Sequence, residues 1–285
     1  MSNLTTKAML VKLSIAIPAM KKYDKKATAE VAQAHGTATT VGRYNKSLLG
    51  QDAPVYKALQ QCANAARTTH YEQTLPWSND EHRILPSTNY LEYSQRMRTH
   101  NHNTDNAAQD FFADYPALVT QAQRLLNGLY NPADYPSVAD LRHKYSFSVK
   151  YSPLPDASDF RVELLDDDVQ AIRDSITRDV NESVQGAVTN LYERMHAHVS
   201  RMAERLGDED AVFRDSLVLN IRELCDILPR LNLTGDANLD AMAQRINAEL
   251  GMFEPDELRE SKALRSEIAR KALQAQSDLA TFMGI

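Results

Sequence analysis

The stretch DDDVQAIRDSITRDVNESVQGAVTNLYERMHAHVSRMAERLG, residues 166–207, predicts the dominant element of this chain. Its apolar side chains recur at a mean spacing of 3.7 residues, which suits an α-helix and is close to an 11-residue repeat. Acidic residues suit the start of a helix and glycine suits its left-handed end, so we expect one helix that begins at Asp166 and stops at Gly207. The apolar stripe comprises Val169, Ile172, Ile176, Val180, Val184, Val188, Leu191, Met195, Val199, Met202 and Leu206.

A helix of about 40 residues is about 60 Å long, so it must pack along other helices or stand out as an arm. Further helices are predicted over residues 208–228, with Val212 facing inward, and over residues 236–250 and 255–283. These form a helical bundle or a coiled-coil hairpin. A stripe left uncovered within one chain predicts a homo-oligomer. The candidate interaction residues on it are Val180, Val184, Val188, Leu191 and Met195.

The N-terminal part predicts a small sheet. Residues 11–17 alternate apolar and polar side chains and indicate a strand that Pro18 ends. SFSVKY (146–151) and DFRVEL (159–164) predict a hairpin. The remainder is expected to be helical, with an interruption at the polar run HNHNTDN (100–106). The predicted fold is mainly α with a small β element: an α+β region over residues 1–165 and a long-helix bundle over residues 166–285.

Composition indicates a soluble globular protein, with 43% hydrophobic and 25% charged residues. No apolar run approaches the ~20 residues that span a bilayer, and no signal peptide is evident, so we expect no membrane association. Cys62 and Cys225 are expected to be reduced thiols, as in a cytoplasmic protein. Net charge is −6, but residues 1–100 carry +6 and residues 101–285 carry −12.

A basic cluster near the N-terminus is the best nucleic-acid-binding candidate. Two tyrosines, Tyr23 and Tyr44, interleave with it and could stack on bases. A lysine run beside a strand end is also typical of a solvated face, and both interpretations stay open. The cluster comprises Lys21, Lys22, Lys25, Lys26, Arg43 and Lys46.

No catalytic residue, metal site or cofactor is predicted. The sequence has no Gly-rich phosphate loop and no GxSxG nucleophile motif. His100 and His102 could bind a metal in an extended loop, although no third ligand follows at a standard spacing. His196 and His198 diverge on a helix, and capping explains the acidic run that begins at Asp166 better than a metal does.

The segment TLPWSNDEHRILP (74–86) contains Trp77, the only tryptophan. Two prolines stiffen a loop that is too polar and irregular for a helix or a strand. Trp77 and the pair Ile84 and Leu85 are expected to fold back onto the core. An exposed Trp77 would instead mark a partner site, so it is a candidate interaction residue.

Several motifs together resemble one known family. They are TLPW (74–77), RILP (83–86), YLEY (90–93), FFADYPALV (111–119), YNPADYPSVADLRHKYSF (130–147), PLPDASDFRV (153–162) and NIRELCDILPRLNLTGDANLDAM (220–242). Nearly the whole chain is similar to domain-of-unknown-function family 3150 of tailed phages and bacteria. The resemblance implies a phage protein in the cytoplasm of a bacterial host. It also implies a genomic context of MoxR-type AAA+ ATPases, and it brings no catalytic residues.

The sequence thus favours a non-enzymatic phage accessory protein. It would act as an adaptor or assembly partner of another protein, such as a MoxR-type AAA+ ATPase or a host target. A nucleic-acid-binding protein of phage replication or counter-defence is the alternative, and an enzyme whose site is assembled from distant residues is a third.

Overall fold

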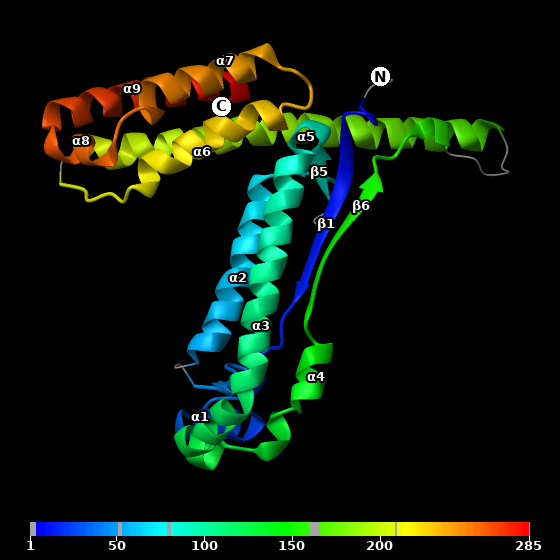
Figure 1. The fold of residues 1–285 in the computed structure, drawn as a ribbon, viewed down its shortest axis with the longest axis vertical. Helices are drawn as coiled ribbons and strands as arrows, with labels where there is room; N and C mark the ends of the chain where they lie inside the picture. The colour runs from blue at the N-terminus through cyan, green and yellow to red at the C-terminus, as the bar shows by residue number, and fades with distance from the viewer. Residues whose placement is uncertain (1–3, 51–52, 79–80, 160–165, 209, 285) are drawn as a thin grey trace. The chain divides into compact units, whose positions relative to one another are not determined.

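The computed structural model describes residues 4–50, 53–78, 81–159, 166–208 and 210–284. Helices dominate the described residues and the strands form a small antiparallel sheet, so the chain is mainly α with a small β element, as predicted (Figure 1). The chain divides into two units. Unit 1 comprises residues 1–12, 71–93 and 150–285, and unit 2 comprises residues 13–70 and 94–149.

This division differs from the predicted boundary between residues 165 and 166. The cause is β1 (Ala8–Ala16), whose first residues pair antiparallel with β5 (Arg83–Pro86), from Ala8 opposite Pro86 to Val11 opposite Arg83. Leu10 and Ile84 then join the hydrophobic core of the C-terminal helices. Long-range strand pairing of this kind leaves no local signal in the sequence.

The long helix α5 (Asp166–Gly207) is a single helix, as predicted. Figure 1 shows α6 (Ser216–Leu231), α7 (Ala237–Ile246) and α9 (Lys262–Met283) gathered along its C-terminal half. The buried side chains of α5 accordingly all lie between Ala187 and Leu206. From Val169 to Val180 the stripe is only half-buried. Unit 1 is therefore a helical bundle built on one half of α5.

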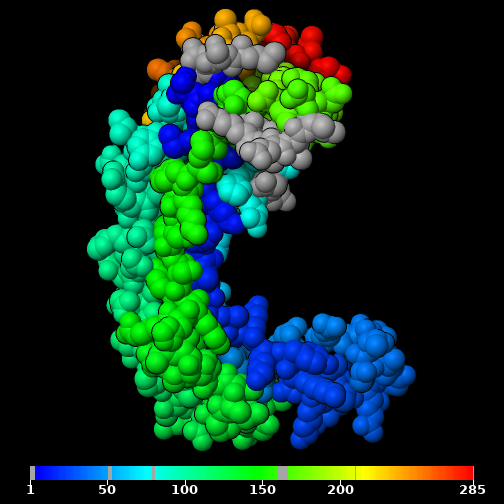
Figure 2. Space-filling view, turned by 90° about the vertical axis from the view of Figure 1, so that its right-hand side faces the viewer, coloured from blue at the N-terminus to red at the C-terminus, as the bar shows by residue number. Residues whose placement is uncertain are grey.

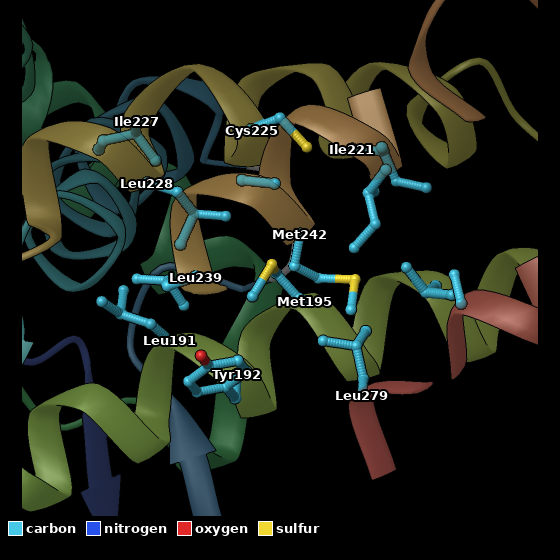
Figure 3. Close-up of a cluster of buried hydrophobic side chains, with 14 of the residues drawn as sticks. Leu191, Tyr192, Met195, Ile221, Cys225, Ile227, Leu228, Leu239, Met242 and Leu279 are labelled. Carbon is cyan, nitrogen blue, oxygen red and sulfur yellow. The ribbon is translucent and has the colours of Figure 1, made fainter. Parts of the chain in front are cut away.

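The core of unit 1 is mainly aliphatic and sulfur-containing (Figure 3). Side chains from four helices meet there, and Met195 and Leu228 are fully buried. Burial of each such side chain contributes about 1.5–3 kcal/mol. The labelled members are Leu191, Tyr192 and Met195 of α5, Ile221, Cys225, Ile227 and Leu228 of α6, Leu239 and Met242 of α7, and Leu279 of α9.

Two predicted helices of the C-terminal part have different bounds. The helix expected from Asp208 begins only at Ser216, and Val212, which was expected to face inward, is 91% exposed. The expected final helix is divided into α8 (Pro255–Glu260) and α9, because the Ser261 hydroxyl accepts a hydrogen bond from the Leu264 amide and begins a new helix. Local capping therefore sets the start of α9, whereas Asp215, the residue before α6, makes no side-chain capping bond.

Arg265 provides hydrogen-bond donors at the C-terminal end of α5. Its guanidinium donates to carbonyls at and beyond the C-terminal end of α5, which would otherwise lack partners. These carbonyls belong to Arg205, Leu206, Asp208 and Ala211.

The sheet has the strand order β4-β5-β1-β6. β6 (Ser146–Pro153) confirms the strand predicted at SFSVKY, whereas the strand predicted over residues 159–164 lies outside the described residues from position 160 onward. β4 (Leu75–Pro76) and β5 fall in the segment expected to be an irregular loop, so that expectation was wrong. Leu75, Ile84 and Leu85 are fully buried, and hydrophobic anchoring outweighs the poor strand propensity.

Unit 2 is built on parts of α2 (Pro54–Glu72) and α3 (Tyr90–Leu126). α3 runs without interruption through HNHNTDN, contrary to the prediction, and it also contains Pro116. Thr104 is fully buried, and the His100 ring nitrogen lies 2.9 Å from the Thr69 hydroxyl of α2. Tertiary packing has overridden the weak helix propensity of this run.

The core of unit 2 is rich in aromatic rings. Phe111 of α3 lies 5.1 Å from the ring centroid of Tyr56 and 5.7 Å from those of Phe112 and Tyr115. α4 (Val138–His143) covers this core with Leu141. It begins at Ser137 with a reciprocal capping box.

Candidate interaction site on the α1 lobe

Residues 21–47 of unit 2 form a segment that we name the α1 lobe. It comprises β2 (Lys21–Tyr23), α1 (Lys25–Ala34), a loop over residues 35–44 and β3 (Asn45–Ser47), and the two strands pair as an antiparallel ribbon. The Asp24 carboxylate accepts a hydrogen bond from the Ala27 amide at 3.0 Å and begins α1. In Figure 2 the blue lobe stands out at the lower right from the green part of unit 2.

A buried ion cluster anchors the α1 lobe. The Lys46 ammonium lies 2.8 Å from the Asp134 carboxylate and 3.0 Å from that of Asp24, and it donates to the Leu129 carbonyl at 2.7 Å. The Lys22 ammonium lies 2.6 Å from Asp134. The side chains of Lys46 and Asp134 are only 6% and 5% exposed. The cluster therefore ties β3 and the start of α1 to the 3-10 turn Pro132–Asp134.

The position of Asp134 resolves a repulsion between two lysines. Lys22 lies opposite Lys46 in the ribbon, and like charges in that position are destabilising. Asp134 bonds both ammonium groups and thereby raises the pKa of Lys46. Burial alone would raise the pKa of Asp134, but the two lysines hold it below its usual value. The Ala27 amide and then Lys46 likewise lower the pKa of Asp24.

The ion cluster divides the predicted nucleic-acid-binding residues into two groups. Lys46 is buried and fully engaged, so its inclusion was wrong, because a phosphate could not reach its ammonium. Lys22 is half-exposed but is directed to Asp134. Alternate side chains of a strand point to opposite faces, so Lys21 and Tyr23 lie on the face away from Asp134.

Lys21, Lys25, Lys26 and Arg43 remain at the surface of the α1 lobe. Lys26 makes only a long, exposed contact of 3.8 Å with Glu30. The other members of this set form no ion pair with the described residues. Four cations are therefore available to an anionic partner.

A groove of 410 Å³ opens between α1 and the loop that follows it. Thr28 and Ala32 line it from one face of α1, and His35 lines it from the position directly after the helix. Val31 also lines it and is 51% exposed, and Val41 on the loop side is 75% exposed. The exposed lining is mainly apolar, its aliphatic members are Val31, Ala32, Ala38 and Val41, and Thr37, Arg43 and Tyr44 also line it.

Val31 and Val41 were not predicted as site residues. They lie in ATAEVAQAHGTATTVG (27–42), which is rich in alanine and threonine. Alanine and threonine side chains are too small to build a core around two valines. The composition of this segment could therefore have indicated that Val31 and Val41 are exposed.

The candidate interaction residues of unit 1 differ in how deeply they are buried. Leu191 and Met195 are buried beneath the neighbouring helices, so they cannot meet a partner and their inclusion was wrong. Val184 and Val188 are partly buried against the same core, and Val180 is half-buried. The bundle within one chain buries the stripe from Leu191 onward, so those stripe residues are not available to a second copy of the chain.

Trp77 packs partly against the core of unit 1, as expected for an anchor. Its other side borders a shallow groove of 310 Å³ on α5, which is lined by Asp179, Glu182 and Gly186. Neither carboxylate forms an ion pair in the described part of the chain. This groove is acidic, in contrast to that of the α1 lobe.

The titratable groups elsewhere show the effects of burial. Burial raises the pKa of the Cys225 thiol to about 12, which keeps it protonated and unreactive. Burial lowers the pKa values of His100 and His198. Among the described residues no group of three or more His, Cys, Asp or Glu side chains could hold a metal ion, and none of the described helices is long and apolar enough to cross a membrane.

No family model, curated protein or solved structure matches this chain. The resemblance to family 3150 therefore stays a prediction.

Proposed function

We propose that this chain is a non-enzymatic interaction protein, an adaptor or assembly partner that docks another macromolecule on the α1 lobe. The observation that carries the proposal is the open groove with aliphatic walls, flanked by cations that have no strong partner within the described chain. Its volume lies within the range of about 300–1,000 Å³ typical of ligand sites.

The anchoring of the lobe supports the same function. Lys46 and Asp134 fix β3 and the start of α1 before any partner arrives. A rigid surface loses little conformational entropy on binding, which favours affinity. Val31 and Val41 are exposed without contributing to the core, as is typical of interaction surfaces.

The resemblance to family 3150 supplies the first partners to consider. A MoxR-type AAA+ ATPase or a host protein in the bacterial cytoplasm would bind the lobe of this phage accessory protein. Homo-oligomer formation is compatible with this function.

Site-specific photo-crosslinking in infected cells tests the proposal. A photo-crosslinking phenylalanine replaces Val41, and the matched control replaces Val212, which is even more exposed but lies in unit 1. We expect a defined crosslinked species from position 41 that is absent from position 212. Equal labelling from both positions, or none from position 41, would contradict the proposal.

Nucleic-acid binding is the second candidate function. Tyr23 and Tyr44 are 45% and 40% exposed beside Lys21 and Arg43, an arrangement that can stack bases and contact phosphates. Gel shifts with single-stranded oligonucleotides at low and moderate salt test it. Binding that is strong at low salt and weak at moderate salt would favour this function.

A further inference from the structure

We infer that the groove of the α1 lobe binds an acidic peptide segment of a partner protein, in which Asp or Glu side chains flank an aliphatic side chain. This inference rests on the proposed function and specifies its ligand. The groove combines exposed aliphatic walls with adjacent unpaired cations, and this peptide matches both.

The shape and lining of the groove favour an aliphatic occupant. Val31, Ala32 and Val41 present methyl groups, and Tyr44 is the only aromatic side chain among the described lining residues. Aliphatic side chains gain from contact with such walls by the hydrophobic effect. The nearby Tyr23 ring has the Arg43 guanidinium 5.9 Å from its centroid, so that face is already covered.

The charges next to the groove favour flanking carboxylates. Lys25 precedes Thr28, Ala32 and His35 at helical spacing, so it lies at the N-terminal end of the face that lines the groove. Arg43 lines the opposite wall, where its planar group can bond a carboxylate through two hydrogen bonds. The positions of these cations on both walls fit an acidic residue on either side of the aliphatic one.

The same observations argue against nucleic acid as the occupant. Single-stranded nucleic acid binds best where a row of cations follows the backbone and exposed aromatic rings stack on successive bases. Here most apolar residues of the lining are aliphatic rather than aromatic, and two of the six basic residues, Lys22 and Lys46, are directed inward to Asp134. A protein segment is therefore the occupant that the geometry fits.

Selection from a displayed library of random peptides against the immobilised full-length chain tests the inference. We expect the enriched peptides to carry Asp or Glu within two or three positions of Leu, Ile or Val. A synthetic peptide from the enriched set is then measured by fluorescence anisotropy. We expect Val41→Asp and Arg43→Glu each to weaken its binding at least tenfold.

Two controls keep the result interpretable. Val212→Asp introduces the same charge at an exposed valine of unit 1 and should leave the peptide affinity unchanged. Val41 is 75% exposed, so Val41→Asp is expected to fold, which circular dichroism checks. Lys25→Glu is a further variant that leaves the groove walls intact and should weaken binding through charge alone.

Several outcomes would overturn the inference. The selection could enrich basic or non-aliphatic peptides, or it could enrich no peptide above the level obtained with the Val41→Asp chain. A selected peptide could also bind the Val41→Asp chain as tightly as the unchanged chain. Oligonucleotide binding that Arg43→Glu abolishes and Val41→Asp leaves intact would assign the cations to nucleic acid instead. If position 41 still crosslinks to a protein in cells, the proposed function survives while this ligand class is rejected.

Discussion

Unit 1 holds 19 Lys and Arg against 30 Asp and Glu, a net charge of −11, whereas unit 2 holds 13 against 8, a net charge of +5. Their interiors differ as well. Unit 1 buries aliphatic and sulfur-containing side chains between helices, and unit 2 buries clustered aromatic rings next to an ion cluster. The charge contrast between the units is about as large as that between residues 1–100 and 101–285, and the basic surface of unit 2 lies beside the open groove of the α1 lobe.

The two units also fix their irregular segments by different chemistry. In unit 1, arginines donate to backbone carbonyls: Arg265 at the end of α5, Arg222 to Gly251 and Phe253, and Arg194 to Tyr71 and Thr74. In unit 2, the ion pair between Lys46 and Asp134 fixes the irregular segment instead. Carbonyls do not titrate but carboxylates do, so the units should respond differently to substitution and to pH.

Replacement of Lys46 should have the largest effect and should act on unit 2. Lys46→Met leaves Asp134 and Asp24 without their buried partner, which costs about 3–5 kcal/mol. Hydrogen exchange measured by mass spectrometry should show faster exchange over residues 21–47 and unchanged exchange in α9. Lys46→Met combined with Asp134→Leu should recover much of the loss, because the more deeply buried carboxylate is then removed and Asp24 keeps its bond from the Ala27 amide. Equal loss in single and double variants would contradict this account.

A core truncation should have a comparable or smaller effect and should act on unit 1. Leu228 is fully buried in α6, and Leu228→Ala removes its contacts and leaves a cavity, at a cost of about 2–5 kcal/mol. Urea unfolding followed by hydrogen exchange should locate the loss in α5, α6 and α9. The matched exposed control is Leu219→Ala on the same helix, at 41% exposure. A similar loss from both variants would show that the core is assigned incorrectly.

Arg265→Met should weaken unit 1 less than a core truncation does. The substitution keeps much of the aliphatic side chain but removes the donors to carbonyls of residues 205–211. Loss of hydrogen bonds from a charged donor costs about 1.5–3 kcal/mol. Thermal unfolding should show the loss of stability, and the rate of hydrogen exchange should increase first at the C-terminal end of α5. Increased exchange confined to unit 2 would refute the role of Arg265.

Acid should open the α1 lobe of unit 2. The folded-state pKa of Asp134 lies below its unfolded value of about 3.9, so its contribution to stability is present above that pH and is lost as pH falls through the folded-state pKa. The pKa of Lys46 is raised in the folded state, so its contribution to stability is lost only as the pH rises into strong alkali. Hydrogen exchange between pH 5 and pH 3, corrected for intrinsic rates, should show the lobe opening, with a shallower pH dependence in Lys46→Met.

The smallest effect on stability is expected from Lys25→Glu. Lys25 is exposed and has no ion pair with the described residues, so the free energy of unfolding should change by less than about 0.5 kcal/mol. Urea unfolding checks this. A loss as large as that of Lys46→Met would mean that Lys25 belongs to the scaffold rather than to the binding surface.

The sequence predicted elements whose signals are local. The acidic start, the period of the stripe and Gly207 identify α5, and Ser137 and Asp236 identify the caps of α4 and α7. Pairings between distant residues were not predictable in this way. Lys46 looks like any lysine of a basic run until the fold brings Asp134 to it, and RILP becomes a strand only because β1 pairs with it.

The candidate site was predicted only in part. Lys21, Lys25, Lys26 and Arg43 were identified from charge, which sequence shows directly. Val31 and Val41 were missed because a valine in a helical pattern usually packs inward. Their exposure depends on the conformation of the loop that connects α1 to β3, and a periodic pattern of side chains does not predict that conformation.

The interleaving of the two units has a consequence for synthesis on the ribosome. All of unit 2 lies between residues 13 and 149, whereas unit 1 requires segments before and after that range. At about 5–20 residues per second, translation of the remaining chain takes on the order of ten seconds. During that interval β1 and β5 can pair while Leu10 and Ile84 still lack the helices that later cover them. Nascent chains stalled near residue 150 should therefore bind chaperones through the first strand.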